Sequence, residues 1–290
     1  MLSSVLFGST TALGWGCADF IARFTGRAIG HHSALMGMLG ISAVVLTLVV
    51  WFADIELVTD VSAWWQIVLS GVGIMLATLF LYWGLERGPV TVVAPIVGAY
   101  PAFNLLFAVV TGVRPSLWQW VAMGLVMLGV IVVAACAEIE VAEEDEEHDR
   151  SEITKTIIIA IISSIGFALT VAAAQQAMET YGELQTIWLA RWVGFVAIAC
   201  LFVIRGEAPT MPIRWWPVLT VQGVLDATAY VSLLYGSMGI GAQMTVVIGS
   251  SFSAVTVVLA KIFLHEPMSW RQWLGIGFIL SGVILISTYK

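Results

Sequence analysis

The 290-residue chain is 60% hydrophobic and only 11% charged, whereas soluble domains have about 45–50% apolar and about 25% charged residues. This composition excludes an ordinary water-soluble protein and indicates many membrane spans. The net charge of −7 at pH 7 is a local feature, because segment 138–152 holds nine acidic residues and one basic residue. The rest of the chain carries +1, so the acidity predicts neither a basic partner nor a nucleic-acid partner.

Ten apolar runs are long enough to cross a bilayer, whose core of about 30 Å needs about 20 mostly apolar residues per helix. In the first half the expected spans are Leu2–Ile21, Ala34–Ala53, Ala63–Leu85, Val90–Thr111 and Leu117–Ala137. In the second half they are Thr154–Ala174, Leu184–Ile204, Trp215–Tyr235, Ala242–Phe263 and Trp270–Ser287. We therefore predict an all-α integral membrane protein that crosses the cell membrane repeatedly.

The two halves of the chain are related by a tandem duplication. An offset of 152 residues pairs identical residues at Gly14 and Gly166, Trp64 and Trp216, Gly71 and Gly223, Gly84 and Gly236, and Pro115 and Pro267. After a slip of one residue, an offset of 153 pairs Trp120 with Trp273, Gly124 with Gly277, and Gly129 with Gly282. Self-similarity at a fixed period is the signature of repeated structural units.

These spacings predict repeat 1 at residues 1–137, an acidic linker at 138–153 and repeat 2 at 154–290. The charge density of the linker and its lack of aromatic residues predict a solvated segment. Because five spans per repeat is an odd number, the second copy enters the membrane from the opposite side, which predicts ten transmembrane helices in two inverted five-helix repeats. Nine basic residues fall on one side of the membrane and two on the other, which places both termini outside the cytoplasm.

The ends of both repeats carry a family resemblance. Each contains a proline in a turn, then tryptophan and spaced glycines in an apolar helix, and segment 84–95 reads GLERGPVTVVAP. This pattern resembles the EamA domains of the drug/metabolite transporter superfamily over nearly the whole chain. The resemblance implies a carrier with a central cavity lined by helices 1, 3 and 4 and their partners 6, 8 and 9. The chain departs from the pattern where Glu266 precedes the second proline but Arg114 precedes the first.

Ionisable residues inside the predicted seventh and eighth spans are candidates for function. Asp226 lies near the middle of the eighth span, where an ionised carboxylate costs about 2.5–3.5 kcal/mol. Gln222, Asp226 and Tyr230 recur every four residues and therefore share one helix face. Arg191 lies at a depth in the seventh span that permits an ion pair with Asp226. In the functional hypothesis Asp226 binds a proton or a cationic group, and Arg191 adjusts its protonation or holds an anionic group; the alternative is a structural ion pair that only fixes helix packing.

The fourth and ninth spans carry helix-breaking residues at corresponding positions. Pro95, Gly98 and Pro101 lie within seven residues, and the matching part of the ninth span holds the Gly-Ser-Ser run 249–251 and Ser253. Each proline removes a backbone donor and kinks the helix. Interrupted spans at corresponding places of two halves point to the binding site of a carrier.

Three further residues are candidate cavity contacts. Tyr100 and Asn104 lie four residues apart in the fourth span, and Trp15 lies in the first. The alternatives are an interhelical hydrogen bond for Asn104 and plain packing for Trp15.

We therefore expect a secondary transporter of small metabolites or drugs, with export favoured, that works by alternating access and uses proton coupling or exchange. Carriers of lipid headgroups or nucleotide sugars with the same fold, and a membrane scaffold without transport, are the alternatives. The sequence has no phosphate-binding Gly-x-x-x-x-Gly-Lys loop, so the chain alone is not an ATP-driven pump. The predicted spans contain no histidine and no cluster of carboxylates, so we expect no enzyme, no metal and no cofactor.

Overall fold

The structure is a computed structural model that describes residues 2–110, 112, 114–143, 147–236 and 242–288. Throughout these residues the regular structure is helical. In chain order the elements are α1 (Leu2–Ile29), α2 (His31–Ala53), α3 (Trp64–Arg87), α4 (Val90–Gly98), α5 (Tyr100–Val110), α6 (Leu117–Glu143), α7 (Glu147–Tyr181), α8 (Glu183–Arg205), η1 (Ile213–Trp215), α9 (Trp216–Gly236), α10 (Ala242–Gly249), α11 (Phe252–Leu259), η2 (Ala260–Leu264) and α12 (Trp270–Thr288).

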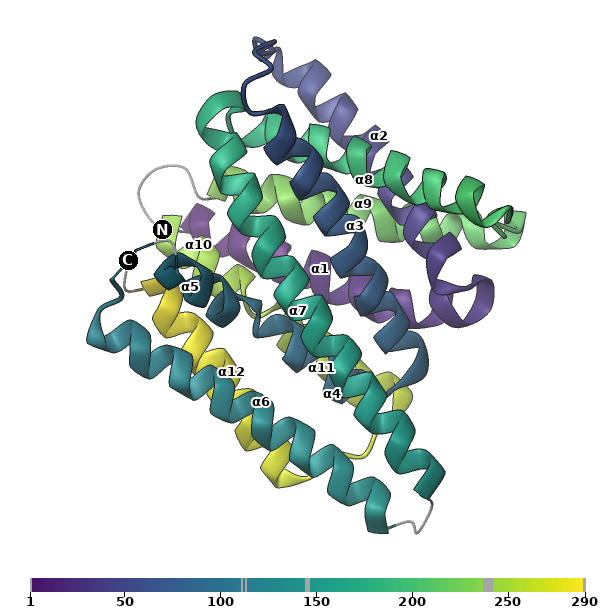
Figure 1. The fold of residues 1–290 in the computed structure, drawn as a ribbon, viewed down its shortest axis with the longest axis vertical. Coiled ribbons are helices and arrows are strands. Elements are labelled where there is room, and N and C mark those ends of the chain that lie inside the picture. The colour runs from purple at the N-terminus through teal and green to yellow at the C-terminus, as the bar shows by residue number, and fades with distance from the viewer. Residues whose placement is uncertain (1, 111, 113, 144–146, 237–241, 289–290) are drawn as a thin grey trace.

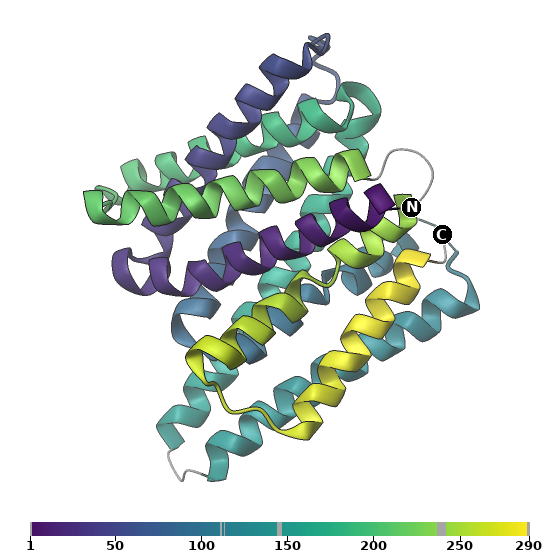
Figure 2. The ribbon, with the colours of Figure 1, turned by 180° about the vertical axis from the view of Figure 1, so that it is seen from behind.

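The helices of the described residues confirm the expected membrane fold. Nine stretches are long and apolar enough to cross a bilayer, and the shorter apolar helix Trp270–Ile286 completes the set of ten. The pairs α4–α5 and α10–α11 each form one span that is broken in the middle. Both termini lie next to each other at one end of the helix bundle (Figures 1 and 2).

The break between α4 and α5 follows from the prolines, as predicted. Helix α4 ends at Gly98 and α5 begins at Tyr100. Because Pro101 has no N–H, it cannot satisfy the carbonyl oxygen of Val97 one turn earlier. The hydroxyl of Ser164 on α7 donates to that oxygen at 3.3 Å instead. Broken backbone at membrane depth is tolerated where other protein groups supply the missing hydrogen bonds.

The helices on both sides of the acidic segment extend further than predicted. The expected spans end at Ala137 and begin again at Thr154, whereas α6 runs to Glu143 and α7 begins at Glu147. Glutamate and alanine are good helix formers, so the helix continues beyond the apolar run. The side chains of residues 137–150 lie outside the described part, and the solvation of this segment stays a prediction.

Helices of one half pack mainly against helices of the other half. Helix α1 packs against α9, and the repeat-related pair α7 and α3 makes the equivalent contact. In the same way α3 packs against α8, and α9 packs against α2. Helices α6 and α12, the last helix of each repeat, lie side by side along one edge of the molecule (Figures 1 and 2). The two inverted repeats therefore interlock.

Gly71 and Gly223, one of the glycine pairs that revealed the duplication, lie where these helices cross. A Cβ atom added at Gly71 would lie 2.5 Å from the Cβ of Val193 on α8, and one added at Gly223 would lie 2.7 Å from the Cβ of Ile41 on α2. Such distances are shorter than van der Waals contact, so only glycine fits. Small residues at helix crossings let two backbones approach closely within a membrane.

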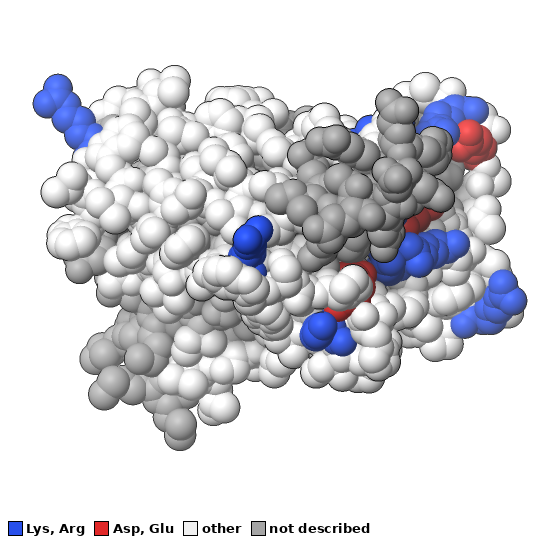
Figure 3. All heavy atoms as spheres, turned by 90° about the horizontal axis from the view of Figure 1, so that it is seen from below, with Lys and Arg blue, Asp and Glu red and all other residues white. Residues whose placement is uncertain are grey.

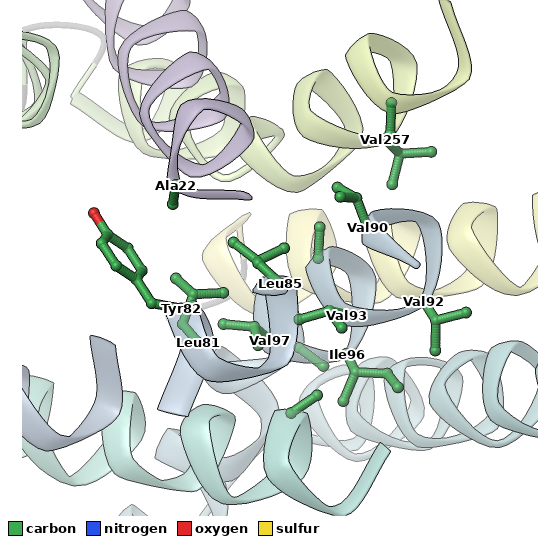
Figure 4. Packing of buried hydrophobic residues seen from close by; sticks show 14 of the residues in the cluster. Ala22, Leu81, Tyr82, Leu85, Val90, Val92, Val93, Ile96, Val97 and Val257 are labelled. Atoms are coloured by element: carbon green, nitrogen blue, oxygen red, sulfur yellow. The ribbon is translucent and has the colours of Figure 1, made fainter. Parts of the chain in front are cut away.

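A compact group of aliphatic side chains joins α3 to α4 beside these crossings. Leu85, Val90, Val93 and Ile96 are fully buried, and Figure 4 shows them gathered around the turn between the two helices. The cluster holds the start of α4 in a fixed position relative to α3.

The basic residues gather at the end of the bundle opposite the termini. In Figure 3, most Lys and Arg side chains lie toward one end of the visible face, several of them beside acidic residues. Because successive spans run in opposite directions, α1, α3 and α8 all end at this same end of the bundle. Their last turns contain Arg27, Arg87 and Arg205. We call it the basic end, and its location in the cytoplasm stays a prediction.

We predict that Gly71→Ala destabilises the protein by about 1–3 kcal/mol, because overpacking forces α3 and α8 apart. Gly124 provides the matched control, since a Cβ at this helical position meets nothing within 4 Å. Gly124→Ala is expected to be neutral or stabilising, by up to about 1 kcal/mol, through the higher helix propensity of alanine. Thermal unfolding of the purified proteins in one detergent compares them, and equal midpoints for the two variants would contradict the close crossing.

Candidate functional site

A cavity of about 740 Å³ lies at the centre of the bundle, between the two interlocked halves. Its wall contains residues from α1, α3, α5, α7, α8 and α9, with further contributions from the broken helices. Six of the seven residues predicted from the sequence line it: Trp15, Tyr100, Asn104, Arg191, Asp226 and Tyr230. The structure thus brings together residues from four spans that are far apart in the chain.

A buried ion pair joins α8 to α9 at the cavity wall. Nη2 of Arg191 lies 3.1 Å from each carboxylate oxygen of Asp226, and both side chains are almost completely buried. The hydroxyl of Ser42 on α2 donates a further hydrogen bond of 2.7 Å to Asp226. The predicted pairing is therefore confirmed, and it fixes three helices relative to one another. Nη1 of Arg191 is buried and makes no hydrogen bond within the described residues.

Aromatic rings surround this pair. The guanidinium carbon of Arg191 lies 4.4 Å from the ring centre of Tyr230, at a distance typical of a cation–π contact. The ring of Trp15 meets Tyr230 edge-on at 4.8 Å between centres, and meets Phe252 at 5.8 Å. One wall of the cavity therefore combines charge with flat apolar surface, as small-molecule sites do.

Gln222 lies outside the cavity lining, although it shares a helix with Asp226 and Tyr230. It is fully buried, and its Nε2 donates to the hydroxyl of Tyr82 at 2.7 Å and to the carbonyl of Ala18 at 3.2 Å. The hydroxyl of Thr25 donates to its Oε1 at 3.2 Å. These hydrogen bonds connect α9 to α1 and α3 behind Ala18 and Tyr82, which line the cavity. A contact between Gln222 and the substrate stays a prediction.

The sequence interpretation missed Asp19, which also lines the cavity. It lies on α1 four residues after Trp15 and within electrostatic reach of Asp226. The signal was present, because an aspartate inside an apolar span is a functional candidate in its own right. The expected first span, Leu2–Ile21, puts Asp19 near its end and not near its middle, where a charged side chain would be most costly.

The cavity extends toward the end of the bundle that carries the termini. Its lining reaches the exposed Glu183 at the start of α8, Gln119 in the first turn of α6 and Ile286 near the end of α12. All three positions belong to the terminal end. Toward the basic end the lining stops near Asp19 and Tyr82.

A network around Glu266 joins three segments at the basic end, beyond the described lining of the cavity. Its carboxylate accepts hydrogen bonds from the backbone N–H groups of Val90 and Thr91, at 3.0 and 2.9 Å. These N–H groups form the start of α4, where the positive end of the helix dipole favours an anion. Arg23 on α1 lies 3.8 Å from Glu266 and donates to the carbonyl of Leu85 at 2.8 Å. One carboxylate thus connects α1, the α3–α4 turn and the segment before α12.

Comparison with known proteins assigns the family. The sequence profile described as "EamA-like transporter family" matches residues 2–135 and again residues 154–288. A protein of Synechocystis sp. named "uncharacterized transporter" is 24% identical over 232 residues, which cover 78% of this chain and 67% of that protein. A solved crystal structure with 14% sequence identity shares the fold at a TM-score of 0.66, covering 98% of this chain and 96% of that one.

We predict that Arg191→Met lowers stability strongly, by about 3–5 kcal/mol, because it leaves the Asp226 carboxylate buried without its partner charge. The double variant Arg191→Met/Asp226→Leu is expected to recover most of the loss, since no buried charge remains. Thermal unfolding in detergent measures both variants. A double variant as unstable as the single one would show that the charges do not act as a pair.

We predict that Glu266→Gln loosens the closed basic end, because a neutral amide binds the start of α4 less strongly than a carboxylate does. The reporter is Thr25→Cys, a fully buried position, in a background where Cys17, Cys136 and Cys200 are serine. A polar maleimide should label this cysteine slowly, and at least several times faster when Glu266→Gln is added. Equal labelling rates would show that Glu266 does not hold the closure.

Proposed function

This chain belongs to the EamA-like transporter family, and we propose that it is a secondary transporter that exports small metabolites or drugs by alternating access through the central cavity. The family assignment makes it a multi-pass transporter of the cell membrane. The substrate class, the direction and the coupling are the parts that we propose.

The observation that carries the proposal is a cavity that is open at one end and closed at the other. It lies between two inverted halves, which is where carriers built from inverted repeats bind their substrates. Rocking of one half against the other would close the terminal end and release the network at Glu266. The same residues would then face the opposite side of the membrane.

The size and chemistry of the cavity fit a small molecule. Its volume of about 740 Å³ falls within the range of about 300–1,000 Å³ found for small-molecule pockets. A carrier of nucleotide sugars would need cationic groups for the phosphates, and Arg191, the one basic side chain in the described lining, is already paired with Asp226. A scaffold without transport would have no use for a cavity that reaches two buried charges. Both alternatives are therefore less well supported than a carrier of small metabolites or drugs.

We further propose that Asp226 couples transport to protons. It is an ionisable group at membrane depth that contacts both the cavity and Arg191. Protonation of Asp226 would weaken the ion pair that joins α8 to α9, and would thereby link proton binding to the packing of two helices.

We predict that Asp226→Asn abolishes proton-coupled transport while membrane insertion stays normal, because asparagine neither ionises nor forms an ion pair with Arg191. Solid-supported-membrane currents from liposomes under a pH gradient test this with amino acids, sugars, nucleotide sugars and cationic dyes. Asp54→Asn is the control, since it makes the same chemical change in an exposed loop. Transport by Asp226→Asn that equals the wild type at every pH would refute the coupling role.

A further inference from the structure

The cavity contains two aspartates in different circumstances. Asp226 is held by Arg191 and Ser42 at 3.1 and 2.7 Å. Asp19 also lines the cavity, but it has no hydrogen bond or ion pair with any of the described residues. A carboxylate at membrane depth is costly unless a partner compensates its charge. Asp19 is therefore a carboxyl group without a partner among the described residues, and a cationic ligand in the cavity would stabilise its charged form.

The electrostatic balance of the cavity favours a positive ligand. Asp19, Asp226 and Glu183 are the acidic side chains of its described lining, and Arg191 is the one basic side chain. Since Arg191 and Asp226 neutralise each other, the remaining field comes from Asp19 in the depth and Glu183 at the mouth. A cleft lined by one sign of charge concentrates ligands of the opposite sign.

The surroundings of Asp19 fit an organic cation better than an inorganic one. Trp15 lies one turn away on the same face of α1. Its ring contacts the rings of Tyr230 and Phe252 edge-on. Aromatic faces attract ammonium groups through cation–π contacts and pack against apolar bodies. Hard metal ions instead require about six or more oxygen ligands, and no group of three His, Cys, Asp or Glu side chains suited to a metal occurs among the described residues.

We propose that Asp19 binds the cationic group of the transported compound, and that the substrates are organic cations with an ammonium group attached to an aromatic or aliphatic body. This inference rests on the proposed transport function and specifies its substrate class. In the bound state the ammonium lies between Asp19 and the ring of Trp15, and the apolar body extends toward Tyr100 and Phe167, whose rings lie 6.2 Å apart. The Arg191–Asp226 pair forms the adjacent wall.

Calorimetric titration of the full chain in detergent tests the proposal. The probe is benzyltrimethylammonium, whose charge does not change with pH, and the comparison compounds are benzyl alcohol and phenylacetate. We expect the cation to bind more tightly than both comparison compounds. Asp19→Asn should weaken cation binding at least tenfold and leave the alcohol unaffected, whereas Asp54→Asn should bind like the wild type.

Three results would overturn the proposal: equal cation binding by the wild type and Asp19→Asn, preferential binding of phenylacetate, or no cation binding at all. Asp19→Glu controls for misfolding, because it keeps the charge and should retain cation binding that the asparagine variant loses. The transport currents separate this inference from the proposed function. A current evoked by a neutral or anionic substrate, without cation binding, would keep the transporter and reject the substrate class.

Discussion

The close crossing of helices from opposite halves is the constraint on which the structure depends. In a bilayer the lipid tails are as apolar as the side chains, so helix association relies on close packing and interhelical hydrogen bonds. Gly71 and Gly223 provide this packing at equivalent crossings, where any side chain would collide with the facing helix. Because each half packs mainly on the other, the cavity forms between them, and a relative movement of the halves would change which end is open.

The two repeats differ at one position beside the basic end. In the second repeat Glu266 accepts hydrogen bonds from the start of α4 and lies 3.8 Å from Arg23 on α1. The equivalent residue of the first repeat is Arg114, which carries only donors and has the same sign as a helix N-terminus. Arg114 therefore cannot accept hydrogen bonds from backbone N–H groups as Glu266 does. This departure from exact duplication replaces a hydrogen-bond acceptor of the second repeat by a residue that carries only donors in the first repeat.

Inside the cavity, the contacts divide the charged residues into separate roles. Asp226 is paired with Arg191 and Ser42 and joins three helices, whereas Asp19 lines the cavity without a partner among the described residues. The first arrangement suits a group whose protonation changes helix packing. The arrangement of Asp19 suits a group that contacts the substrate.

Span length, the duplication and the broken helices were readable in the sequence, because apolar runs, glycine spacing and proline act locally along the chain. The Arg191–Asp226 pair was predictable from depth alone, since neighbouring spans are antiparallel. The direction in which each helix face points could not be predicted from the sequence. Gln222 shares a face with Asp226 yet lies beneath the cavity, and Asp19 joins the site because α1 packs on α9. Such contacts depend on how helices of different halves rotate and cross, which only the packed bundle fixes.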